Sequence, residues 1–197
     1  RQMCIRDSFY TTLERLPLLD YILNQFTKKP IAKLDAPVRA VLRAGLAQAR
    51  YMNVPLPAAV NESVKLTRAL GKSSAAGMVN AVLRRAAGAA VSESDFPDLL
   101  ERLSVYYCLS RPVAELLYAQ FGAEAFPLAA AFYCKPKTTI RVNTLRTDDA
   151  SLTALLQAEG HTVSTGPWPG ALIVDFAGSP AASATFQKEL FHVQGLA

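Results

Sequence analysis

The hydrophobic period of this chain changes once, and the change divides it into two parts. From residue 8 to about residue 133, apolar residues recur at intervals of three and four, as they do on the buried face of an amphipathic helix. From Thr138 to Asn143 the pattern alternates and is rich in β-branched residues, which is typical of a strand. The sequence therefore predicts a mainly α fold, a helical bundle followed by a small α/β module.

Proline and glycine residues mark the ends of the expected elements. In the first part we expect helices over 8–28, 37–52, 58–70, 74–87, 99–106, 112–121 and 123–133. In the second part we expect strands over 138–143, 161–164 and 171–176, with a helix between the first two that Thr147 caps and Gly160 ends. Residues 191–197 resemble a strand that enters something larger, so we expect a truncated module.

Three ranges follow from this organisation. We expect residues 1–8 to be a possible non-native leader, residues 9–134 a helical region, and residues 135–197 the α/β module. No window approaches ~18 uninterrupted apolar residues, which predicts a soluble, cytoplasmic protein without a membrane segment. Three scattered cysteines and two histidines, His161 and His192, predict neither a disulfide framework nor a metal site.

The positive charge is concentrated in the first half. Between Phe9 and Ala90 there are twelve Lys and Arg residues against four acidic residues, whereas from Ala119 onward five basic residues face six acidic ones. A surface that binds a polyanion such as RNA is therefore expected in the first half.

Three arginines of the second predicted helix form what we call the arginine stripe. Arg39, Arg43 and Arg50 lie within ~40° of one another at ~100° per residue. No acidic residue lies between Asp35 and Glu62, so we expect the stripe to be unpaired and to contact RNA phosphates. The alternative is a solvated helix face.

Other candidate RNA-binding residues are distributed over both parts of the chain. A second basic row is predicted on the next helix, and two arginines end the fourth, where the helix dipole alone could explain them. In the first predicted strand, Arg141 and Asn143 should face outward while Ile140 and Val142 face the core. Alternatively, Asn143 only ends the strand and caps the turn towards Thr147. The candidates outside the arginine stripe are Lys65, Arg68, Lys72, Arg84, Arg85, Arg141 and Asn143.

Two further polar or aromatic residues have competing interpretations. Asn80 lies beside an apolar stripe, where a satisfied structural residue is the simpler interpretation. Trp168 lies in a Pro/Gly-rich turn and could stack on a base, but we favour the interpretation that it caps its own module.

Motifs for catalysis are absent from the sequence. There is no glycine-rich loop after a strand, no Walker lysine loop and no HExxH motif. Neither histidine has a plausible nucleophile or acid partner nearby in sequence. We therefore expect no catalytic, cofactor-binding or metal-binding residues in this chain.

Residues 38–85 resemble the helical RNA-binding domain that NusB antitermination factors share with RsmB-type cytosine-C5 methyltransferases of small-subunit ribosomal RNA. Ala58 departs from the pattern, because such proteins often have His there. The tail resembles the insert that leads into the methyltransferase domain of the RsmB type. The matching segments are Leu42-Arg43-Ala44-Gly45-Leu46-Ala47-Gln48, Pro57-Ala58-Ala59-Val60-Asn61-Glu62-Ser63-Val64, Val79-Asn80-Ala81-Val82-Leu83-Arg84-Arg85, Ile140-Arg141-Val142-Asn143-Thr144-Leu145 and Phe191-His192-Val193-Gln194.

The resemblance implies a function and a missing part. It implies that the chain binds small-subunit ribosomal RNA, while S-adenosylmethionine and two catalytic cysteines belong to a C-terminal methyltransferase domain absent from the chain. Carbon 5 of cytosine is not nucleophilic until a thiolate adds to carbon 6, so the chain itself should be inactive. The alternatives are a stand-alone NusB-like antitermination module and a helical protein-interaction module.

Overall fold

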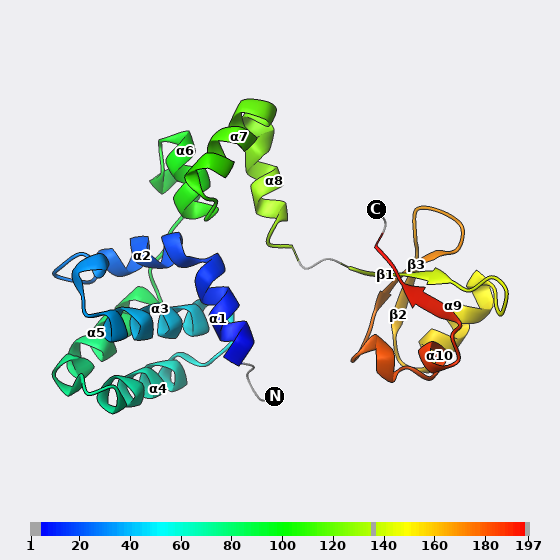
Figure 1. Ribbon diagram of the computed structural model, residues 1–197, viewed down its shortest axis with the longest axis horizontal. Helices are drawn as coiled ribbons and strands as arrows, with labels where there is room; N and C mark the ends of the chain where they lie inside the picture. The colour runs from blue at the N-terminus through cyan, green and yellow to red at the C-terminus, as the bar shows by residue number, and fades with distance from the viewer. Residues whose placement is uncertain (1–4, 135–136, 196–197) are drawn as a thin grey trace. The chain divides into compact units, whose positions relative to one another are not determined.

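The computed structural model describes residues 5–134 and 137–195, which belong to two units, Arg1–Tyr133 and Cys134–Ala197 (Figure 1). The first unit is helical and the second contains a four-stranded antiparallel sheet with helices. The predicted fold class, a mainly α chain with a helical bundle followed by a small module of strands and helices, is confirmed.

The first unit follows the predicted order of helices. Its α-helices are α1 (Ile5–Glu14), α2 (Leu16–Asn24), α3 (Ala36–Tyr51), α4 (Leu56–Ala69), α5 (Ala76–Ala86), α6 (Leu99–Glu101), α7 (Arg111–Phe121) and α8 (Ala125–Ala131). Short 3-10 turns lie at Ile31–Lys33, Ser73–Ala75, Glu93–Asp95 and Gly122–Glu124, and a π-helical turn lies at Arg102–Tyr106.

The first predicted helix is in fact two helices. The chain leaves helical geometry at Arg15, which has φ −106° and ψ 10°, and α2 then begins with a proline in its first turn. Pro17 has no backbone N–H to donate to the preceding turn. A single helix over 8–28 would therefore lose a backbone hydrogen bond at this position. Residues 5–8 of the possible leader lie in α1, and residues 1–4 lie outside the described residues.

Helix α3 lies at the centre of the first unit and packs against α1, α2, α4 and α5 (Figure 1). Its apolar face is buried with the inner faces of α2, α4 and α5, as the three-and-four spacing predicts. The buried residues of this core are Leu18, Leu19, Ile22, Leu23, Ile31, Val38, Val41, Leu42, Leu46, Ala47, Val60, Val79, Val82, Leu83, Ala86 and Phe96.

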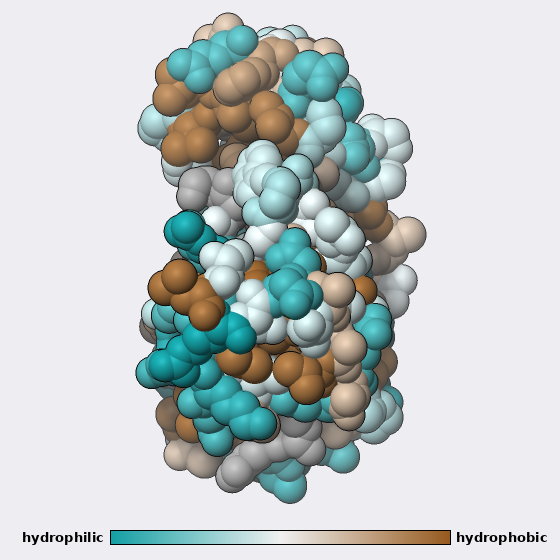
Figure 2. Space-filling model, turned by 90° about the vertical axis from the view of Figure 1, so that its right-hand side faces the viewer, coloured by the Kyte–Doolittle hydropathy of each residue, from teal (hydrophilic) through white to brown (hydrophobic). Residues whose placement is uncertain are grey.

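A second, smaller core joins the π-helical turn to α7 and α8 around Leu103, Tyr107 and Ala114. Arg15 connects it to the main bundle, because its guanidinium lies 5.0 Å from the ring centre of Tyr51 and 3.3 Å from that of Tyr133. The outer faces of α7 and α8 are apolar, as the brown area at the top of Figure 2 shows. The exposed apolar residues there are Val113, Leu116, Phe121, Leu128 and Phe132.

The second unit is one sheet with helices on one face. It consists of β1 (Thr138–Val142), α9 (Asp149–Ala158), β2 (Thr162–Thr165), β3 (Ala171–Asp175), α10 (Ala184–Gln187) and β4 (Phe191–Val193), with strand order β2-β3-β1-β4 and every pair antiparallel. Its core residues are Ile140, Val142, Leu152, Leu156, Leu172, Val174 and Phe191.

The predicted cap of α9 is wrong by one residue. Asp148, not Thr147, is the N-cap, and its Oδ1 accepts a hydrogen bond of 2.8 Å from the backbone N–H of Ser151. A capping oxygen must reach the N–H of the third helical residue, and that residue is Ser151 because the helix begins at Asp149.

Helix α3 packs tightly against α4 and α5 at Gly45. A Cβ atom there would overlap Ser63 Oγ and lie 2.9 Å from a methyl carbon of Leu83. Ser63 is itself held, since its Oγ donates to the carbonyl of Ala59 at 2.7 Å. Gly45 is therefore needed for helix contact, not for backbone flexibility.

We predict that Gly45→Ala lowers the free energy of unfolding by about 1 to 3 kcal/mol, because overpacking outweighs the gain in helix propensity. Gly77→Ala is the matched control, since no atom lies within 4 Å of its added Cβ, and it should not destabilise. Urea unfolding followed by circular dichroism measures both. Adding Ser63→Ala should recover part of the loss, and equal stability of Gly45→Ala and wild type would contradict the packing argument.

Candidate nucleic-acid interface

Arg43 of the arginine stripe has an acidic partner, so the prediction of an unpaired stripe is wrong. Its Nε donates to Asp20 Oδ1 at 2.7 Å and its Nη2 to Asp20 Oδ2 at 2.5 Å, with side chains 21% and 26% exposed. The acid comes from α2, and only the packing of α2 against α3 brings it to the arginine. Such a bidentate, partly buried pair fixes one helix against another.

Arg50 is also occupied by a structural contact. Its Nη1 lies 3.2, 3.3 and 2.8 Å from the carbonyl oxygens of Ala86, Ala87 and Ala89, at the C-terminal end of α5. The Ala86 carbonyl also accepts from the N–H of Ala89 at 3.2 Å. Carbonyls at the end of an α-helix lack a partner within the helix, and a cation there also complements the helix dipole. Arg50 therefore caps α5 from the neighbouring α3.

Three of the other predicted cations have partners nearby. Lys65 pairs with Glu62 at 2.8 Å in an exposed contact on α4, whose neighbouring Arg68 is also exposed. Arg84 Nε donates to Asn80 Oδ1 at 3.0 Å, which agrees with the structural interpretation of Asn80. Lys72 pairs with Asp35 at 2.6 Å and, through this hydrogen bond and its charge, holds the pKa of the Asp35 carboxyl below its usual value.

The segment that joins α2 to α3, residues 26–35, brings together cations from several elements, and we call it the basic loop. Three exposed lysines lie on it, Lys28, Lys29 and Lys33. Ile31 anchors it: its side chain is buried in the main core, and its backbone N–H donates to Asn24 Oδ1 at 2.7 Å. The loop is thus anchored to the core through Ile31 and carries three exposed lysines.

Three sequence-predicted cations contact the basic loop. Arg85 lies over the ring of Phe26 at 5.2 Å from its centre, Arg39 Nη1 donates to the carbonyl of Ala32 at 2.9 Å, and Lys72 pairs with Asp35. Cations from α3, from α5 and from the turn after α4 therefore contact the loop that carries the three lysines.

The loop lysines were missed by the sequence analysis because they belong to no periodic helix. The available signal was the run Lys28-Lys29-Pro30 with Lys33 close behind and no acid before Asp35. Together with Arg39, Lys72 and Arg85, these lysines make the basic loop the candidate nucleic-acid interface of the first unit.

The predicted orientation of β1 is confirmed for its apolar residues, since Ile140 and Val142 are buried and Arg141 is exposed on the opposite face. Asn143 has structural contacts: its Nδ2 donates to the carbonyl of Glu189 at 2.9 Å, and its Oδ1 accepts from the N–H of Leu145 at 3.3 Å. These bonds favour the alternative in which Asn143 ends the strand and holds the following turn.

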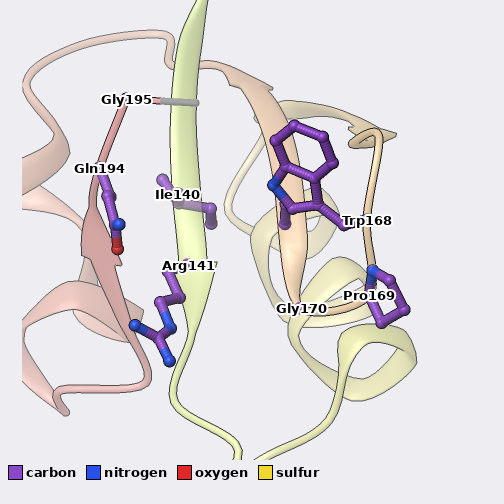
Figure 3. A pocket seen from close by; sticks show the side chains of 8 residues that line it. Ile140, Arg141, Trp168, Pro169, Gly170, Gln194 and Gly195 are labelled. Atoms are coloured by element: carbon purple, nitrogen blue, oxygen red, sulfur yellow. The ribbon is translucent and has the colours of Figure 1, made fainter. Parts of the chain in front are cut away.

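Trp168 is 55% exposed, which does not favour the interpretation that it caps its own module. It lines a hollow of about 280 Å³ together with Arg141 of β1 and Gln194 (Figure 3). The ring lies over β3, while the Arg141 side chain is directed towards β4, so the two line different sides of one hollow.

His161 has an acid neighbour, contrary to the sequence analysis, but the contacts are structural. Its Nε2 lies 3.6 Å from Glu159 Oε2, and Glu159 also accepts from Ser183 Oγ at 2.6 Å and from the N–H of Thr185 at 3.0 Å. Burial raises the pKa of Glu159, but the hydrogen bonds from Ser183 and Thr185 outweigh burial and lower the pKa. The carboxylate therefore holds the start of α10 rather than activating a nucleophile.

Within residues 5–134 and 137–195, no group of three or more His, Cys, Asp or Glu side chains could hold a metal ion. No helix of the described part is long and apolar enough to cross a membrane.

We predict that Arg43→Gln lowers the free energy of unfolding by about 1 to 2 kcal/mol, because Asp20 would keep its partly buried charge without a partner. Arg68→Gln is the control, since Arg68 is exposed on α4, and it should change stability by less than about 0.5 kcal/mol. Urea unfolding of both variants tests this, and equal stabilities would show that the pair does not hold α2 against α3.

Val142→Ala should cost about 1 kcal/mol or more, because it removes packing from the core of the second unit, whereas Arg141→Ala should cost much less. Thermal unfolding of the two variants compares them directly. Equal destabilisation would mean that Arg141 is a structural residue.

Comparison with known proteins identifies both units. Residues 2–88 match the NusB family, and residues 113–179 match the ferredoxin-like domain of RsmF/B-like methyltransferases. Ribosomal RNA small subunit methyltransferase B of Xanthomonas campestris is 32% identical over 80% of this chain and 34% of its own length. The probable ribosomal RNA small subunit methyltransferase B of Bacillus subtilis is 30% identical over 94% of this chain and 42% of its own.

A solved structure shares the fold. The crystal structure of PH0851 aligns with a TM-score of 0.61 over 96% of this chain and 43% of that chain, at 18% identity. The chain spans less than half the length of each of these three proteins. It therefore belongs to the family of the ribosomal RNA small subunit methyltransferases B and carries the NusB and ferredoxin-like domains of their N-terminal portion.

Proposed function

We propose that this chain is the part of a small-subunit ribosomal RNA cytosine-C5 methyltransferase that binds and positions the RNA. The observation that carries the proposal is the basic loop, which bears the exposed Lys28, Lys29 and Lys33 and which Arg39, Lys72 and Arg85 contact at Ala32, Asp35 and Phe26. A concentration of cations from separate elements is the arrangement that phosphate binding requires.

The candidate residues have different roles in this proposal. Arg43 and Arg50 hold the bundle together, and Asn143 holds a turn, so they support the interface without contacting RNA. The exposed cations contact phosphates, which positions the RNA without reading its sequence. These phosphate contacts come from the basic loop with Arg39, Lys72 and Arg85, and from Lys65, Arg68, Arg84 and Arg141.

The chemistry of the whole protein is assigned to the remainder of the parent. The relatives are two to three times longer than the matched region, and their names describe a ribosomal RNA methyltransferase. We infer that S-adenosylmethionine, the methyl donor of the parent, and the catalytic cysteines belong to that remainder. The isolated chain should then bind RNA without methylating it.

The match of residues 113–179 to an RsmF/B-like domain argues against the first alternative, a stand-alone NusB-like antitermination module. In the second alternative, a helical protein-interaction module, the basic face would meet an acidic protein partner instead of RNA. The exposed apolar residues of α7 and α8 would offer it a further surface.

We predict that changing Lys28, Lys29 and Lys33 together to Gln weakens binding to unrelated structured RNAs. The slope of log affinity against log salt should become shallower by about two to three units, at ~0.7 to 0.9 per lost phosphate contact. Fluorescence anisotropy with a labelled RNA hairpin at several salt concentrations measures the slope.

The matched control removes the same charge elsewhere, through Arg6→Gln, Arg111→Gln and Lys188→Gln, and should change the slope by much less. A slope that is unchanged in the loop variant, or equally changed in the control, would remove the basic loop from the interface. Thermal unfolding checks that both variants are folded.

A further inference from the structure

The sheet of the second unit has two chemically different faces. One face is apolar and is covered by α9 and α10, whose residues share a core with Ile140 and Leu172. On the other face, antiparallel pairing aligns Arg141 with Ala171 and with His192, and Ser164 with Ile173. Arg141, Ser164 and His192 are exposed there, so this polar face is open within the part of the unit that the structure describes.

At one end of the polar face lies the hollow of about 280 Å³ between the Trp168 turn and the strands. Figure 3 shows the Trp168 ring in front of β3, while Arg141 comes from the neighbouring β1 and Gln194 from the segment after β4. The lining comprises Ile140, Arg141, Trp168, Pro169, Gly170, Ala171, Gln194 and Gly195, none of which is acidic. An exposed ring and a cation thus share one concave site.

The Trp168 turn is structured rather than loose. The N–H of Gly166 donates to the carbonyl of Ala171 at 2.8 Å, the N–H of Ala171 to the carbonyl of Trp168 at 3.1 Å, and the N–H of Gly170 to Asp149 Oδ2 at 3.0 Å. A Cβ atom on Gly166 would lie 2.6 Å from the Ala171 carbonyl oxygen, so only glycine allows this close approach. The turn therefore holds a large aromatic ring in a position where more than half of the residue is exposed. Packing within the module does not explain this exposure.

A second hollow, of about 350 Å³, continues the polar face towards its other end. Lys137, Thr162, Ser164, Ile173 and Asp175 line it. Lys137 and Arg141 are four residues apart along one strand direction, about 13 Å at ~3.3 Å per residue. An elongated ligand crossing the sheet would meet Arg141 at one end, hydroxyl groups in between, and Lys137 together with the Asp175 carboxylate at the other end.

We propose that this polar face binds single-stranded RNA, with a base stacked on Trp168 and a phosphate held by Arg141. The inference rests on the proposed function and specifies which form of RNA the second unit binds. Bases within a duplex are already stacked, so an exposed ring selects an unpaired base. Charge alone would not bring RNA here, because the second unit has five basic and five acidic residues.

Trp168 is the only tryptophan of the chain, so its fluorescence reports on this site alone. Titrating the full chain with a short unstructured oligouridylate should quench that fluorescence. Trp168→Ala should weaken binding of a labelled oligouridylate by about 5- to 150-fold, and Trp168→Phe by much less, because Phe keeps a ring for stacking. Since the side chain is mostly exposed, Trp168→Ala should keep the melting temperature of the wild type.

Arg141→Gln should make the salt dependence of oligouridylate binding shallower by about 0.7 units, whereas Lys188→Gln, a change near α10 on the other side of the sheet, should not. Binding of the oligouridylate without quenching, or with equal affinity in Trp168→Ala, would overturn the inference. Quenching by an extended acidic peptide but not by RNA would overturn it as well and indicate a protein partner.

The two proposals fail in different ways. If an RNA hairpin binds through the basic loop while the Trp168 variants behave like wild type with oligouridylate, only the single-strand site is lost. If neither hairpin nor oligouridylate binds the wild-type chain, RNA binding itself is wrong.

Discussion

The close approach of α3 to its neighbours at Gly45 is the constraint on which the rest of the first unit depends. The contact with Ser63 and Leu83 leaves no room for a side chain, so it determines how near α4 and α5 can lie to α3. From that distance follow the buried apolar core and the reach of Arg50 to the last carbonyls of α5. The basic loop then lies where α2 must turn back to begin α3.

Positive charge serves two different purposes in this bundle. Arg43 pairs with the carboxylate of Asp20, and Arg50 donates to backbone carbonyls at the end of α5. Both guanidinium groups therefore already have partners within the fold. Lys28, Lys29 and Lys33 lie instead on an anchored loop and are exposed. A cation held in a partly buried contact gains little from a phosphate, whereas exposed cations on an anchored loop gain more, because little ordering is needed on binding. This difference is why the basic loop, rather than the arginine stripe, carries the proposed function.

In the second unit, the alternation of side chains along β1 determines which face of the sheet packs against the helices and which face is exposed. Ile140 and Val142 close the core under α9 and α10, so Arg141 must lie on the opposite face. The Trp168 turn then places an aromatic ring at a hollow that this arginine also lines. The same sheet thereby provides its own stability through one face and a surface for a ligand through the other.

Local sequence patterns determined most of the secondary structure, because a helix or a strand needs only the periodic placement of apolar residues and its breakers. The helical first part, the strand at Thr138–Val142 and the inward direction of Ile140 and Val142 all follow from such patterns. Partners distant in sequence did not follow. Asp20 meets Arg43 across 23 residues, Asn143 meets Glu189 across 46, and the exposed Trp168 lines a hollow together with Arg141. Whether a charged side chain has a partner within the fold, and whether an aromatic ring is buried or exposed, depends on which elements pack together. Only the tertiary structure decides that.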